Sequence, residues 1–226
     1  MGTPSGAELV EEAYGALARV LGDCDEELSW APTACLGWAV RDLTFHCLTD
    51  AQRALVALHT PTSQTPDRDA VTYWRDWSPD AVGAATGRRF VRVAATMFLK
   101  WDELRELYLD TSAAVTEAAA AAPPSRLVRT QGHVLTADDL ARTLCVEATI
   151  HHLDLVDGLG HWLVDRGPTA SGLAEVRRVL DGLVGHPVAL GWTDGRYARV
   201  ATGRARATPD EARSLGPVLD RFPLFS

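Results

Sequence analysis

Three side chains from two separate stretches of the sequence are of the types that bind metal ions. The stretch CVEATIHHLDL, residues 145–155, carries Glu147 and His151 in an otherwise apolar run. A spacing of four places both side chains on one face of a helix, and the apolar neighbours predict that this face is buried. A buried, unpaired carboxylate is unfavourable, so the sequence requires a partner for Glu147.

A second stretch, DLTFHCLTD, supplies His46. Taken singly, His46 could be a satisfied core histidine, and Glu147 and His151 could simply hydrogen-bond each other. Two buried helices that each carry an imidazole, with one carboxylate, form a three-ligand set of the kind that holds catalytic zinc and leaves a fourth position open. His46, Glu147 and His151 are therefore candidate ligands for zinc or a similar divalent ion.

Two acidic residues could orient these histidines by accepting a hydrogen bond from the ring nitrogen that does not bind the metal. Asp50 follows His46 by four residues, and Asp154 follows His151 by three. Ligating histidines usually donate their second ring N–H to such a group. A solvated or helix-end acid is the alternative for each.

An anionic cofactor or substrate would need a guanidinium group. Arg88, Arg89 and Arg129 are the candidates within the first 160 residues. The C-terminal segment offers further candidates, namely Arg199, Arg204 and Arg206.

These residues need long helices to position them. Helical spacing of apolar residues predicts four: about 7–21, 38–59, from Ser78-Pro79-Asp80 to about 121, and 137–157. Gly83 or Gly87 could break the third helix, and residues 126–135 are expected to form an extended crossover segment. Four helices joined by two long connections indicate a four-helix bundle over residues 1–160.

The remaining residues, 161–226, have a different pattern. A helix is predicted over 173–185, a hairpin about Thr193-Asp194-Gly195, and a capped helix from Thr208. The fold class is therefore mainly α: a bundle with a small α+β C-terminal module (helix, hairpin, helix) that packs on it, because so short a module has little core of its own.

The bulk properties restrict the partners. A formal net charge of −8 argues against nucleic acid, which needs clustered Lys and Arg. No apolar run reaches the roughly 18 residues of a membrane span, and the start of the sequence does not resemble a signal peptide. The four cysteines lack metal-binding spacing and fit a reducing compartment. A cytoplasmic protein that binds a small-molecule substrate is expected; the sequence does not indicate an oligomeric state.

Three stretches, CLGWAVRDLTFH, VRTQGHVLTADDL and VEATIHHLDL, resemble the mycothiol-dependent maleylpyruvate isomerase branch of the DinB-like four-helix bundles. The C-terminal ATGRARATPDEARSLG resembles the end of actinobacterial members. The resemblance implies that His46, Glu147 and His151 hold a metal, usually zinc. A glutamate ligand favours the isomerase branch over DinB-like proteins with three histidines.

The resemblance also implies mycothiol as co-substrate. A zinc-dependent enzyme is then expected, in which the metal-bound thiolate attacks a small electrophile, leading to cis–trans isomerisation or thiol transfer. Two alternatives stay open. One is a thiol-independent metal enzyme of a biosynthetic pathway on the same scaffold; the other is a non-catalytic module that binds a small molecule or a protein partner.

Overall fold

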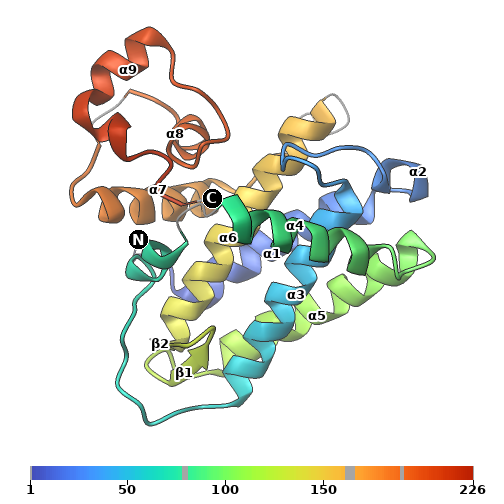
Figure 1. Cartoon of the computed structure of the whole chain (residues 1–226). Coiled ribbons are helices and arrows are strands. Elements are labelled where there is room, and N and C mark those ends of the chain that lie inside the picture. The colour runs from blue at the N-terminus through green and yellow to red at the C-terminus, as the bar shows by residue number, and fades with distance from the viewer. Residues whose placement is uncertain (1, 78–80, 161–165, 189–190, 226) are drawn as a thin grey trace.

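The computed structural model describes residues 2–77, 81–160, 166–188 and 191–225. Four long helices pack against one another and form the main body, here called the bundle (Figure 1): α1 (Gly6–Gly22), α3 (Val40–His59), α5 (Trp101–Ala121) and α6 (Ala137–Leu159). Shorter elements connect them: α2 (Glu26–Ser29), the 3-10 helix η1 (Thr72–Asp76) and α4 (Ala81–Ala95). The predicted mainly helical fold is confirmed. None of the described helices is long and apolar enough to cross a membrane.

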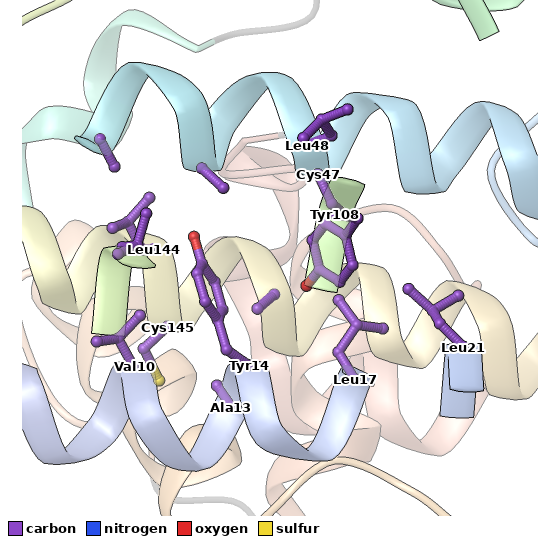
Figure 2. Packing of buried hydrophobic residues seen from close by; sticks show 14 of the residues in the cluster. Val10, Ala13, Tyr14, Leu17, Leu21, Cys47, Leu48, Tyr108, Leu144 and Cys145 are labelled. Carbon is purple, nitrogen blue, oxygen red and sulfur yellow. The ribbon is translucent and has the colours of Figure 1, made fainter. Parts of the chain in front are cut away.

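The core of the bundle is built from the apolar faces that the sequence predicts. Tyr14 and Leu17 of α1 point into the space between α1 and α3, where Leu48 lies (Figure 2). Tyr108 of α5 and Leu144 of α6 belong to the same buried cluster. Burying such side chains is the main favourable term in folding, at roughly 25 cal/mol per Å² of apolar surface.

The start of α6 is fixed by its own sequence. The Thr136 hydroxyl accepts a hydrogen bond from the Asp139 backbone N–H at 3.0 Å, which satisfies one of the free donors of the first turn. This cap confirms the predicted start of the helix that carries Glu147 and His151.

The predicted third helix is wrong in one respect, because it consists of two helices. The chain runs helically through Gly87 in α4 and then breaks between residues 96 and 100. A distant residue stabilises the new start, since the Glu26 carboxylate accepts from the Trp101 backbone N–H at 2.7 Å. The predicted start at residues 78–80 lies outside the described residues.

Residues 126–135 form a hairpin and not the expected crossover segment. Strand β1 (Leu127–Thr130) pairs antiparallel with β2 (His133–Thr136). The connecting residues Gln131 and Gly132 have φ of 49° and 88°. Two positive φ angles in a two-residue loop match the strand twist of a tight hairpin.

The C-terminal segment is helical in its described part. It contains α7 (Ala170–Val184), α8 (Asp194–Ala201), α9 (Pro209–Leu215) and the 3-10 helix η3 (Gly216–Arg221). The predicted hairpin about Thr193-Asp194-Gly195 is wrong. The Thr193 hydroxyl accepts from the Arg196 backbone N–H at 3.2 Å and caps α8, so the same residues begin a helix.

Two of the C-terminal helices, α7 and α8, contact α6, and Figure 1 shows α7 running beside it. Val146 and Ile150 of α6 belong to a second buried cluster with Val176 and Leu180 of α7. Helix α6 is therefore buried on two sides, which explains the unbroken run of buried residues from Ala148 to Leu155. The predicted domain boundary after residue 160 stays a prediction.

Candidate metal centre

Two helices bring together the three predicted ligands. His46 lies on α3, and Glu147 and His151 lie on α6; one donor atom from each falls within 4.8 Å of the other two. Glu147 Oε2 is 3.4 Å from His151 Nε2. The imidazole rings of His46 and His151 meet edge to face, with centroids 4.7 Å apart.

Trp38, just before α3, packs against both imidazoles. Its ring centroid lies 5.1 Å from that of His46 and 6.3 Å from that of His151. Trp38 is itself 9% exposed. The indole therefore limits the rotation of both rings and keeps water from one side of the cluster.

Asp154 orients His151. The Nδ1 atom of the ring lies 3.0 Å from Asp154 Oδ2, and the carboxylate is fully buried. A bond at Nδ1 leaves Nε2, the atom on the Glu147 side, as the nitrogen that could coordinate a cation once its proton is released. Asp50 stands at the other histidine, with its Oδ2 3.5 Å from His46 Nε2, and also forms an ion pair with Arg53.

The protonation of the cluster reflects its burial. Burial lowers the pKa of His46 to about 4, so this imidazole is neutral and its lone pair is available. Burial, with the Asp50 charge, raises the pKa of Glu147 to about 7. For His151, burial acts to lower the pKa, but the Asp154 hydrogen bond and contacts with Cys35 and Glu147 raise it well above its usual value.

These residues fit a divalent cation. Two imidazole nitrogens and one carboxylate oxygen are the donors that catalytic zinc takes. The ionised form of Glu147 is disfavoured in the protein alone, and an adjacent cation would offset this penalty. An ion between α3 and α6 would supply the partner that the sequence requires for Glu147.

A second cluster of possible ligands in the described part of the chain contains Cys35, His151 and Asp154. Its donors are already in use. Both Asp154 oxygens accept hydrogen bonds from Arg204, and Cys35 Sγ donates to Asp154 Oδ2 at 3.2 Å. A cation there would have to displace a guanidinium group, so the His46 cluster is the better site.

A small recess opens beside Glu147. Asp50 and Arg53 border it from α3, while Tyr73 and Gln131 approach from outside the bundle, joined by a hydrogen bond of 2.9 Å from Gln131 Nε2 to the Tyr73 hydroxyl. The other lining residues are Ala54, Thr130, Leu140, Thr143 and Leu144. The recess combines one guanidinium group with hydroxyl and amide groups, but its cavity of about 20 Å³ has little more than the room that one water needs.

The predicted binding arginines of the bundle lie elsewhere. Arg88 and Arg89 line an open groove between α4 and residues 30–39, where Trp38 forms part of the wall. Arg129 is exposed on β1, and its neighbour Thr130 lines the recess. Successive strand residues point to opposite faces, so Arg129 points away from the recess.

Sequence reasoning missed several residues near the cluster. Arg53 could have been found, because it lies three residues after Asp50 and so continues the stripe of α3 that carries His46. Cys35 comes from a loop, Tyr73 from η1 and Gln131 from the hairpin turn, and no local pattern marks them. His152, on another side of α6, hydrogen-bonds the Arg166 carbonyl oxygen through Nε2 at 2.7 Å.

The fold and the cluster define the class, a DinB-like helical protein with a candidate metal site between two of its long helices. Comparison with known proteins identifies the family within this class. The profile of the mycothiol maleylpyruvate isomerase N-terminal domain matches residues 10–156, so the chain belongs to this family.

Solved structures agree with this fold. A crystal structure of a mutant of the mycothiol-dependent maleylpyruvate isomerase has a TM-score of 0.59 at 18% identity, and a second crystal structure of that isomerase has 0.57 at 16%. Each comparison covers 88% of this chain and 88% of the other. No curated protein matches the sequence significantly.

Proposed function

We propose that the chain is a divalent-metal enzyme, with zinc as the ion, that uses mycothiol as co-substrate to isomerise a small conjugated cis alkene. The observation that carries the proposal is the convergence of His46, Glu147 and His151 within 4.8 Å, in a chain of the maleylpyruvate isomerase family. Thiol transfer to the same electrophile is the closest variant, because it shares the addition step.

The protein's part is to hold three donors in place. His46 supplies a neutral nitrogen because burial lowers its pKa to about 4, and Asp154 turns Nε2 of His151 toward Glu147. The Glu147 carboxylate supplies the negative charge. A divalent cation bound there would lower the pKa of a thiol that reaches it, so that thiolate is available at neutral pH.

The rest of the substrate would lie at the mouth of the recess, whose cavity of about 20 Å³ is too small to enclose it. Its Arg53 guanidinium can pair with an anionic substituent, although it shares its charge with Asp50. The Gln131 and Tyr73 side chains offer polar contacts at the opposite wall. Trp38 packs over the imidazoles and shields them from bulk water.

The test is to incubate the zinc-loaded protein with mycothiol and maleylpyruvate, the substrate that the related isomerases are named for. Cis-to-trans conversion that requires mycothiol, and that is lost in Glu147→Ala, is the expected result. A stable thiol conjugate would indicate a transferase. Conversion without mycothiol would contradict thiol dependence, and metal binding with neither product would contradict the proposed substrate.

A further inference from the structure

The C-terminal segment reaches the candidate metal centre through one side chain, Arg204. Its Nε donates to Asp154 Oδ1 at 2.8 Å and its Nη2 to Oδ2 at 3.0 Å. Both groups are largely buried, with 13% of the arginine side chain and 1% of the aspartate side chain exposed. A bidentate, buried pair of this kind is geometrically specific.

The backbone before Arg204 is shaped for this approach. Helix α8 ends at Ala201, and Gly203 has φ of 75°. This left-handed conformation suits glycine, and a Cβ there would also lie 3.3 Å from Pro223. The chain turns back, so that the Arg204 N–H bonds to the Arg199 carbonyl oxygen at 2.8 Å and the side chain lies on α6.

Asp154 connects Arg204 to a predicted ligand. The same carboxylate that holds the guanidinium group lies 3.0 Å from Nδ1 of His151. Because Arg204 holds both oxygens, the Asp154 carboxylate cannot rotate freely about its Cβ–Cγ bond. Arg204 therefore holds Asp154, and Asp154 in turn holds the His151 ring. In this way the C-terminal segment fixes the direction of His151 Nε2.

We infer that Arg204 is a positioning residue for the metal centre, acting on His151 through Asp154, so that the C-terminal segment completes a site whose ligands all lie in the bundle. This inference rests on the metal centre of the proposed function. It does not require Arg204 to touch substrate, and two of the guanidinium nitrogens are already used by Asp154.

The structure supplies a matched control. Arg199, on α8, forms a second bidentate pair with α6, to Asp157 at 2.6 and 2.7 Å. This pair joins the same two parts of the chain but contacts none of the three ligands. If Arg204 only held the C-terminal segment in place, loss of either arginine would act alike.

The experiment compares Arg204→Gln and Arg199→Gln in the full chain. Zinc affinity is measured by competition with a chromophoric chelator, and the absorption spectrum of the cobalt-substituted protein reports ligand geometry. We expect Arg204→Gln to weaken zinc binding by about 10- to 100-fold and to change the cobalt spectrum, as for other residues that orient a ligand. Arg199→Gln should keep the wild-type affinity and spectrum.

Arg204→Lys is a second variant that tests the same contact if the glutamine variant does not fold. Lysine keeps the charge but not the two-pronged geometry, so it should fold and bind zinc with intermediate affinity. Equal zinc affinity in wild type, Arg204→Gln and Arg199→Gln would overturn the inference and leave the metal centre intact. A wild-type chain that binds no divalent ion would overturn the proposed metal centre, and the inference with it.

Discussion

The imidazole rings of His46 and His151 meet edge to face at an interplanar angle of 81°, although they come from different helices. Their contact sets how closely α3 and α6 approach at this level of the bundle. Glu147 shares a face of α6 with His151 and is brought to the same point. An ion held by the three groups would join α3 to α6, and should raise the thermal stability of the protein.

Replacement of Glu147 by glutamine should act in opposite directions on metal binding and on the metal-free fold. Loss of a ligand should weaken zinc binding by more than the roughly 100-fold that loss of an orienting residue causes. In the metal-free protein, Glu147→Gln should raise the melting temperature at pH 8. The reason is that burial, with the Asp50 charge, raises the pKa of Glu147 to about 7, so the ionised form is disfavoured there.

The sign of this effect depends on pH. The pKa of Glu147 is about 7 in the folded protein, against an ordinary value of 4.5 in the unfolded chain. The ionised carboxylate therefore destabilises the fold progressively as the pH rises from about 4.5 to about 7. Glu147→Gln should therefore stabilise the metal-free protein more at pH 8 than at pH 5, as measured by thermal unfolding at both values. A gain that is larger at pH 5 would contradict the assigned pKa.

Cys35 should be the most reactive of the four free thiols. Burial raises the pKa of Cys24 to about 11 and that of Cys145 to about 12, and it raises the pKa of Cys47 well above its usual value. The thiolate is the reactive form, so these three should resist labelling at pH 8. Mass spectrometry of the native protein after brief maleimide treatment should show one label, absent in Cys35→Ser; labelling of a second cysteine would disagree with this burial.

Gly158→Ala should destabilise the protein by about 1–3 kcal/mol, the usual effect of overpacking. A Cβ at this position of α6 would lie 2.6 Å from the Thr33 Cα and 2.7 Å from the Pro32 carbonyl oxygen. This backbone segment leads to Cys35 and must shift to make room. Chemical denaturation gives the change in unfolding free energy.

Gly87→Ala is the control for that substitution. Gly87 lies inside α4, and a Cβ there would meet nothing within 4 Å. Alanine at an open helical position should be stabilising by about 0.5–1 kcal/mol. Destabilisation by both substitutions would show that the close approach of Thr33 is not the cause.

Local sequence patterns predicted the parts of the fold that depend on neighbouring residues. Helices α1, α3 and α6 follow from apolar spacing, and the pair Glu147 and His151 from a spacing of four. The start of α5 could not be predicted, because its cap comes from Glu26. Thr193-Asp194-Gly195 was ambiguous, since a threonine before Asp-Gly suits both a turn and a helix cap.

The surroundings of the candidate site were harder to predict from the sequence. Asp154 could be placed near His151 by helical spacing, whereas its pairing with Arg204 depends on how the C-terminal segment returns to α6. Arg88 and Arg129 were chosen by charge alone, and charge does not fix the direction of a side chain. The recess depends on a hairpin turn that the sequence pattern did not reveal.

The decisive measurement for a metal centre between α3 and α6 is the zinc content of the purified chain after reconstitution, compared between the wild type and His46→Ala. About one zinc ion per wild-type chain is expected and little in the variant, because His46 would be the ligand that α3 contributes. Equal zinc content in both proteins, or none in the wild type, would contradict it.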